Sequence, residues 1–191
     1  MAIRSLKSGT FSRSGMVGNP VIMPGSYESI ATVTVGSTSQ SSITFSSIPS
    51  TYTHLQIRLF SKSTQALTDY NYGSVQLNGD TTAANYYQHF LAGDGASATA
   101  GGAASQTRVL TEVCNLPAST FGVTILDILD YSNTNKYKTM RSLTGADLNG
   151  SGGILLRSSL WSNTAAINSI VLLPASGNYQ QYTSAALYGI A

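Results

Sequence analysis

The decapeptide TYTHLQIRLF at residues 51–60 constrains the fold more than any other feature of this chain. Leucine or isoleucine occupies every second position from Leu55 to Leu59, and polar side chains fill the positions between them and before them, including His54 and Gln56. Alternation with a period of two places one set of side chains on a dry face and the other on a wet or partner-facing face. This stretch therefore predicts a half-buried β-strand.

The same alternation recurs in short segments separated by clusters of Ser, Gly, Asn and Pro. Turn signals every ~8 to 15 residues, with no convincing amphipathic helix, are typical of a sandwich or jelly roll. We therefore expect an all-β fold with a single jelly-roll or β-sandwich domain. The segments expected to form strands are Ser29–Val35, Ser42–Phe45, Tyr52–Phe60, Gly73–Leu77, Tyr86–Leu91, Arg108–Val113, Phe121–Tyr131, Lys136–Leu143, Ile154–Leu156, Ile167–Leu173 and Ala185–Ile190.

Two connections carry specific expectations. The pair Asn78-Gly79 indicates a tight turn, because both residues tolerate a positive φ. The segment Ala92–Ser105, AGDGASATAGGAAS, consists of small residues and is expected to be a long surface loop.

The first 25 residues differ from the rest of the chain. They contain Arg4, Lys7 and Arg13 with no acidic residue, several Gly and Pro residues, and no sustained period. Their apolar residues are too numerous for a solvated tail. We expect residues 1–25 to form an extended arm that lies on a neighbouring subunit, and residues 26–191 to form the β-sandwich domain.

Charged residues make up only 9% of the chain, against roughly 25% in an ordinary globular protein. About a quarter of the chain is Ser or Thr, so the surface is expected to be rich in hydroxyl groups and to have little like-charge repulsion between copies. This composition favours self-association or docking on a larger assembly. The net charge of +2 is too small to indicate direct nucleic-acid binding.

The chain also has no apolar run of the length needed for a signal peptide or a membrane span. We therefore expect synthesis and first folding in the cytoplasm and no membrane partner. A protein without an export signal can still leave a cell as part of a particle.

The candidates for acid–base catalysis are weak. His54 and His89 are the two histidines, and neither is flanked by a nucleophile motif. Asp127 and Asp130 have an odd spacing, which puts them on opposite faces of a strand. Asp130 is instead expected to begin a turn and to pair across a hairpin with a cation, for which the candidates are Lys136, Lys138 and Arg141. No catalytic residue is expected.

Metal and cofactor sites are not expected either. The segment DLNGSG at residues 147–152 resembles the first half of a calcium loop, but Ser158 stands where the bidentate Glu is needed. The glycines around Asp94 open no helix and have no nearby Lys-Ser/Thr pair, so they do not form a phosphate loop. Cys114 is the single cysteine and is expected to be a buried apolar residue.

Several aromatic residues lie in or near polar segments and could line a carbohydrate-binding surface. Core packing and subunit contacts use the same residue types, so this alternative stays open. The residues concerned are Tyr70, Tyr72, Tyr86, Tyr87, Trp161, Tyr179 and Tyr182.

Long stretches of the chain resemble a group of small virion-associated proteins of tailed bacteriophages. The matching runs are FSRSGMVGNP from Phe11, YESIATVTVG from Tyr27, ITFSSIPSTYTHLQIRL from Ile43, ILDILDYSNTNKYKTMRSL from Ile125, SSLWSNTAAINSIVL from Ser158 and SAALYGI from Ser184. They cover the chain almost from end to end.

The resemblance implies a jelly-roll or related β-sandwich protein located in the virion, with no catalytic residues to carry over. The leading interpretation is a capsid decoration, or cement, protein that binds the major capsid protein on the outer face of the head as a homotrimer. The alternative is a tail-fibre or receptor-binding domain that recognises a host glycan.

Overall fold

The computed structural model describes residues 26–65, 71–113, 120–147 and 151–191, and the expected arm at residues 1–25 lies outside these ranges. The described residues form strands and connections with no helix, and hence contain no helix that could cross a membrane. The strands are β1 (Tyr27–Thr34), β2 (Ile43–Phe45), β3 (His54–Ser61), β4 (Asn71–Leu77), β5 (Tyr86–Gly93), β6 (Ala98–Gln106), β7 (Val109–Val113), β8 (Gly122–Leu129), β9 (Lys138–Asp147), β10 (Gly152–Trp161), β11 (Ile170–Leu173) and β12 (Ser184–Ile190).

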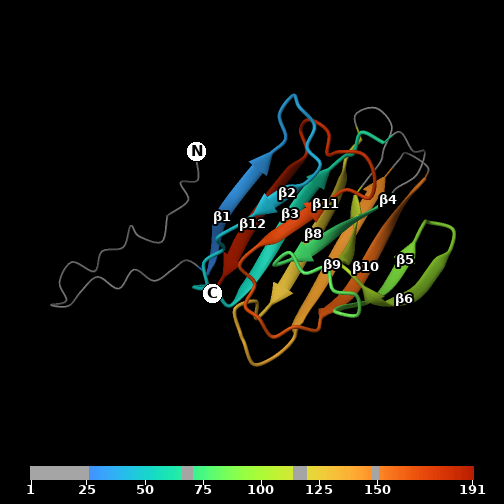
Figure 1. Cartoon of the computed structure of the whole chain (residues 1–191). Coiled ribbons are helices and arrows are strands. Elements are labelled where there is room, and N and C mark those ends of the chain that lie inside the picture. Colours follow the sequence, from blue (N-terminus) through green and yellow to red (C-terminus); the bar gives the residue numbers. More distant parts are fainter. Residues whose placement is uncertain (1–25, 66–70, 114–119, 148–150) are drawn as a thin grey trace, which may run out of the picture.

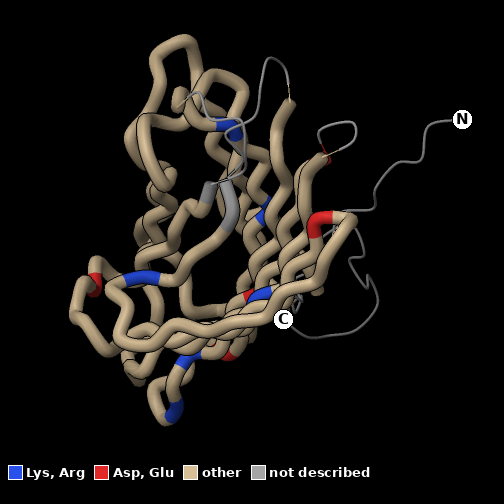
Figure 2. The backbone as a smooth tube through the Cα atoms, turned by 90° about the vertical axis from the view of Figure 1, so that its right-hand side faces the viewer, with Lys and Arg blue, Asp and Glu red and all other residues tan. Residues whose placement is uncertain are grey.

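The strands form two antiparallel sheets packed face to face. The large sheet has eight strands in the order β1-β12-β3-β8-β9-β10-β5-β6, which is also their order from left to right in Figure 1. The small sheet has four strands in the order β2-β11-β4-β7. The fold is thus an all-β sandwich consistent with the jelly-roll type, as the sequence predicts. Figure 2 shows how sparsely charged residues are distributed along the chain.

The alternation in the opening decapeptide has the expected structural result. In β3, Leu55, Ile57 and Leu59 are buried, whereas Gln56 and Arg58 point to the other face. The Asn78-Gly79 turn is also confirmed, because both residues have a positive φ and the Asp80 N–H donates to the Leu77 carbonyl at 2.9 Å.

The expectation of a long loop at residues 92–105 is wrong. Most of that segment belongs to a β-hairpin, in which β5 runs to Gly93 and β6 begins at Ala98. Asp94 closes the turn by accepting the backbone N–H groups of Ala96 and Ser97. Alanine and glycine have low intrinsic strand propensity, but here cross-strand pairing with β5 determines the conformation.

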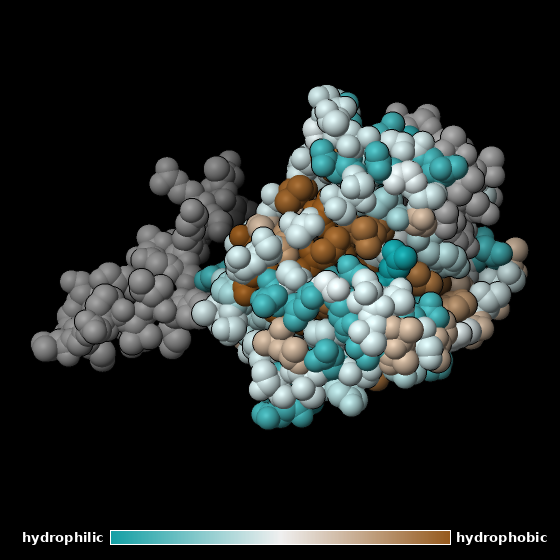
Figure 3. Space-filling model, in the orientation of Figure 1, coloured by the Kyte–Doolittle hydropathy of each residue, from teal (hydrophilic) through white to brown (hydrophobic). Residues whose placement is uncertain are grey.

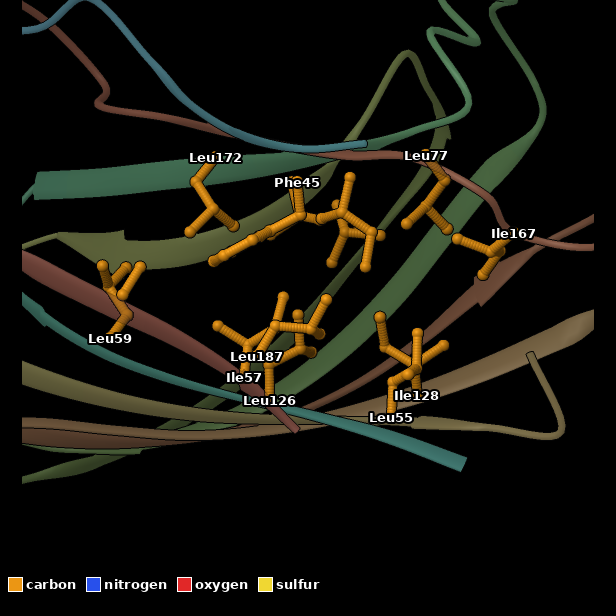
Figure 4. Close-up of a cluster of buried hydrophobic side chains, with 14 of the residues drawn as sticks. Phe45, Leu55, Ile57, Leu59, Leu77, Leu126, Ile128, Ile167, Leu172 and Leu187 are labelled. Carbon is orange, nitrogen blue, oxygen red and sulfur yellow. The ribbon is translucent and has the colours of Figure 1, made fainter. Parts of the chain in front are cut away.

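The apolar core lies between the two sheets over β3, β8 and β12. Side chains of the large sheet meet those of the small sheet across this space (Figure 4). Each fully buried Leu or Ile stabilises the fold by about 1.5–3 kcal/mol. Residues from the large sheet are Leu55, Ile57, Leu59, Leu126, Ile128 and Leu187, and residues from the small sheet include Phe45, Leu77 and Leu172.

The interior is polar where β10 and β5 face the small sheet. Arg157 is only 2% exposed, and its guanidinium lies 5.6 Å from the Tyr72 ring centre and 5.2 Å from that of Phe90. The side-chain oxygen of Gln88 accepts the Leu110 N–H at 3.1 Å, which ties β5 to β7. Polar groups in such an interior require specific partners. The polar side chains between β5, β10 and the small sheet therefore restrict how the two sheets are positioned against each other.

Asp80 organises the connection between β4 and β5. Its carboxylate accepts hydrogen bonds from Trp161 Nε1 at 2.7 Å, from Asn85 Nδ2 at 2.7 Å and from the Thr82 N–H at 2.8 Å. Partial burial raises the pKa of Asp80, but these hydrogen bonds outweigh it and lower the pKa to about 2. The buried indole of Trp161 thereby gains an acceptor for its only polar group.

Lys138 is completely buried at the start of β9. Its ammonium donates to the backbone carbonyls of Asn133, Lys136 and Thr164, at 2.5, 2.9 and 3.0 Å respectively. Burial lowers the pKa of Lys138. All three ammonium protons are used, so this side chain joins the β8–β9 turn to the segment that follows β10.

Tyr131, also completely buried, holds the segment before β3. Its hydroxyl donates to the Pro49 carbonyl and accepts the Tyr52 N–H. These contacts link the end of β8 to the connection that leads into β3.

Candidate interaction surface

The outer face of the large sheet, which points away from the small sheet, is crossed by rows of side chains set by the strand register. Two neighbouring rows are apolar over most of their length, and we call their large members the apolar band. The band runs from β3 to β5 and consists of Phe60, Val123, Ile125, Leu143, Ile154, Leu156 and Leu91.

The apolar band is well exposed. Six of its side chains, all except Ile125, have between 46% and 58% of their surface accessible. Phe60 is further stacked on Phe121, with ring centres 4.8 Å apart. Contiguous apolar patches of this kind on a protein surface mark interaction sites. Figure 3 shows the side of the small sheet, where hydrophobic residues also come to the surface over β2 and β11.

A row of polar side chains, the polar row, runs beside the band on the same face. It contains Tyr188, Gln56, Asp127, Arg141, Ser158 and His89. The amide of Gln56 donates to Asp127 at 2.8 Å, and its oxygen accepts the Tyr27 hydroxyl at 2.7 Å.

Two tyrosines and an arginine form a cluster at the β1 end of this face. Tyr27 and Tyr188 are stacked with ring centres 4.8 Å apart. The Arg58 guanidinium lies 5.4 Å from the first ring and 5.3 Å from the second, within cation–π range. The cluster therefore presents flat rings with a fixed positive charge beside them.

The polar row contains a small depression of about 220 Å³ around Tyr87, His89 and Ser158. His89 and Ser158 are cross-strand neighbours, and the other cross-strand neighbour of His89 is Gly102. Neither cross-strand neighbour of His89 is therefore a carboxylate that could orient the imidazole as a catalytic triad requires. It can offer hydrogen bonds to a polar ligand.

His54 has a structural contact at the end of its strand. Its Nδ1 accepts the backbone N–H of Asp130 at 2.9 Å. Asp130 has a positive φ and begins the turn as expected, and it forms an ion pair with Lys136. The hydrogen bond from Lys136 lowers the pKa of Asp130. Of the three cations proposed for this pairing, Lys136 is thus the one in contact.

Asp127 and Asp130 are separated as the spacing predicted. Asp127 belongs to the polar row with Arg141 as its cross-strand neighbour, while Asp130 lies beyond the end of β8. In the part of the chain that the structure describes, no three His, Cys, Asp or Glu side chains group to hold a metal ion.

The DLNGSG segment lies at a hairpin between β9 and β10, and its residues 148–150 are outside the described ranges. Gly152 has a φ of +132° there, and a Cβ atom would collide with the Ala146 carbonyl. The positive φ and the close approach of the Ala146 carbonyl thus explain this glycine. Cys114 also lies outside the described ranges.

The aromatic residues proposed for a glycan surface do not form one group. Tyr86, Trp161 and Tyr179 are at most 1% exposed and belong to the core, so their proposed role in sugar stacking is wrong. Tyr72, Tyr87 and Tyr182 are exposed, while Tyr70 lies outside the described ranges.

The sequence analysis missed the apolar band. A usable signal was present, because GVTIL in β8 and GILL in β10 carry apolar residues at consecutive positions, which indicates strands with apolar side chains on both faces. Which of these residues align across the sheet depends on the register, which no single strand reveals.

The fold and this face together describe a β-sandwich with an exposed apolar band beside a polar row. No protein-family model, no curated protein and no solved structure matches the chain. The function therefore has to be argued from the surface itself.

Proposed function

We propose that this chain is a structural protein of a bacteriophage virion, and specifically a capsid decoration protein that binds the outer face of the head and stabilises it. The observation that supports the proposal best is the apolar band on the outer face of the large sheet. An exposed face of this kind suits permanent protein–protein contact, because burying it releases water without requiring charges to be desolvated.

The low charge of the chain supports the same proposal. A subunit that covers a head at high density lies close to many identical copies, and a surface with few charges produces little repulsion between them. The resemblance of the sequence to small virion proteins of tailed phages supports a location in the virion. In this proposal the major capsid protein is the partner, and residues 1–25 clamp neighbouring subunits.

The test is the copy number of the protein in purified particles. A decoration protein is present in hundreds of copies per head, and a fibre protein in a few tens at most. Quantitative gel densitometry against the major capsid protein distinguishes the two, and absence from the particles would reject both. A variant lacking residues 1–25 should remain folded but bind heads more weakly.

The alternative is a fibre or receptor-binding domain that takes up a host glycan. The depression beside Tyr87 favours it, because an exposed ring with His89 and Ser158 nearby offers both stacking and hydrogen bonds to a sugar. Binding to a glycan array that is lost on Tyr87→Ala, but retained on Tyr182→Ala, would support this alternative over the decoration role.

A further inference from the structure

We propose that the outer face of the large sheet pairs with the same face of a second copy of this chain. The pairing axis is a twofold that runs parallel to the strands, between β9 and β10. Such an axis reverses the order of the strands in the second copy. It therefore places β9 over β10, β8 over β5, and β3 over β6 of the second copy.

The row at the edge of the band has a size pattern that fits this axis. Under the twofold, each large side chain faces a small residue of the second copy: Phe60 faces Ala98, Val123 faces Gly93, and Ile154 faces Gly145. Across the sheet from β3 to β6 the row is Phe60, Val123, Gly145, Ile154, Gly93 and Ala98.

The two glycines in this row are not required by the subunit itself. A Cβ atom on Gly145 would have no neighbour nearer than 3.6 Å, and one on Gly93 none nearer than 3.8 Å. Neither residue has the positive φ that favours glycine. Glycine inside a strand lowers its stability and often marks the close approach of another chain. The twofold supplies that approach, because both glycines lie beneath large side chains of the second copy.

In the next row of the sheet, apolar residues of one copy face apolar residues of the other. Leu143 faces Leu156 of the second copy beside the axis, and Ile125 faces Leu91. Arg58 lies at the end of the row, opposite Ala100, where its charge stays at the rim of the contact. The centre of this row is therefore apolar, and its one charged group is at the end of the row.

The polar row is also self-complementary about the same axis. Asp127 faces His89 of the second copy, and Arg141 faces Ser158. The two copies of Arg141 are diagonal neighbours beside the axis, and each has Asp127 of its own sheet as a cross-strand neighbour. The twofold thus matches size in one row and apolar character in the second.

The area is sufficient for a stable dimer. Six strands spaced by about 4.8 Å, carrying three rows about 6.8 Å apart, give a footprint of roughly 600 Å² on each copy. The total of roughly 1,200 Å² reaches the lower end of the range for a specific interface. The trimer that we expect from the family resemblance has no such match, because a threefold contact joins two different surfaces and does not require one face to complement itself.

The first test is the mass of the full-length protein in solution by light scattering, over a range of concentrations. We expect twice the mass of one chain. The variant Leu143→Arg, which puts like charges beside the axis, should raise the dissociation constant at least about a hundredfold. The control Tyr182→Arg should leave it unchanged, because this exposed side chain lies in the connection before β12, a strand with no partner strand opposite it.

The second test uses a contact that exists only between copies. Gly93 and Val123 lie on strands separated by β9 and β10, so they cannot touch within one subunit. Gly93→Val and Val123→Gly should each raise the dissociation constant about tenfold. The double variant exchanges the large and small partners and should return to within about threefold of the original value. Circular dichroism melts establish that each variant is folded.

A monomer or a trimer at all concentrations would overturn the pairing, as would a dimer insensitive to Leu143→Arg or a double variant that adds the two single defects. Either of the first two results would leave the face to the arm of residues 1–25 or to the capsid. The pairing does not depend on the proposed function, but it uses the same apolar band, so a dimer on heads would bind the capsid through another surface. A dimer absent from virions would reject the decoration role alone, and a monomer abundant on heads would reject the pairing alone.

Discussion

Replacing Asp80 with Asn tests whether one carboxylate stabilises the β4–β5 connection and Trp161 together. The side chain keeps its shape, but an amide nitrogen replaces an oxygen that accepts hydrogen bonds. If the amide nitrogen faces Trp161 and Asn85, these two donors lose their acceptor, and if it faces the other way, the Thr82 N–H loses its acceptor. An unsatisfied buried donor costs about 1–3 kcal/mol.

The pKa of Asp80 gives a second estimate of the stability that is lost on Asp80→Asn. A decrease from 3.8 to about 2 corresponds to roughly 2.5 kcal/mol, and partial access of solvent to the carboxylate reduces this to about 1–2 kcal/mol. Both estimates give a loss of about 2 kcal/mol for Asp80→Asn. In a domain of this size the melting temperature should fall by about 4–8 °C.

The effect should depend on pH in a defined direction. Because the folded-state pKa of Asp80 is lowered, its stabilisation is fully present above the unfolded value of 3.8 and disappears as the pH falls toward about 2. Urea unfolding of both proteins should thus give a stability difference at pH 7 that shrinks between about pH 4 and pH 2.

Two further variants serve as a control and as a test of the coupling between Asp80 and Trp161. Asp94→Asn changes a carboxylate that caps an exposed turn, and it should reduce stability less than Asp80→Asn does. Trp161→Phe removes the indole donor, so combining it with Asp80→Asn should cost less than the sum of the single changes. A difference below about 0.5 kcal/mol for Asp80→Asn at pH 7 would refute the reasoning, since that is the range of neutral surface changes.

Three other perturbations follow from the fold. Lys138→Met leaves three backbone carbonyls without their shared donor and should destabilise the protein by about 2–4 kcal/mol in urea titration, while an unchanged midpoint would contradict the role of its ammonium. Tyr131→Phe removes the hydroxyl that joins the end of β8 to the segment before β3 and should cost about 1–2 kcal/mol by the same measurement; an effect below about 0.3 kcal/mol would show that those contacts add nothing. Deletion of residues 1–25 should leave a cooperatively folded β domain by circular dichroism, because the core begins at Val35 with partly buried contacts from β1; an unfolded product would place the arm in the core.

The fold class was accessible from sequence because the buried positions of single strands repeat with a period of two. Leu55, Ile57 and Leu59 show this most clearly. The β6 strand was not accessible, since Ala, Gly and Ser carry no alternating apolar signal and its conformation is set by pairing with β5. Local sequence patterns predict strands that bury large residues. They do not predict a strand whose conformation depends on pairing with its neighbour.

The candidate surface was less predictable than the fold for a related reason. Phe60, Ile154 and Leu91 are far apart in the sequence, and only the register of the large sheet brings their rows together. The sequence likewise contains no signal for the hydrogen bond between Asp80 and Trp161, or for the one between Lys138 and the Thr164 carbonyl. Such pairings depend on tertiary geometry, whereas the Asp130 turn was predictable because its partners are close in the chain.

The first and last strands of the described chain are neighbours at one edge of the large sheet. Tyr27 pairs with Ile190, and the Ala191 N–H donates to the Ser26 carbonyl at 3.4 Å. Figure 1 shows the C-terminus beside the start of β1. A short linker could therefore join the two ends of the domain, with new ends opened at the exposed Asp94–Ser97 turn, to give a circularly permuted protein with the same sheets. The same closeness means that a peptide fused after Ala191 leaves the domain at the corner where residues 1–25 enter it. The 94–97 turn joins β5 and β6 at the opposite edge of the large sheet, so a cargo inserted there lies away from that corner.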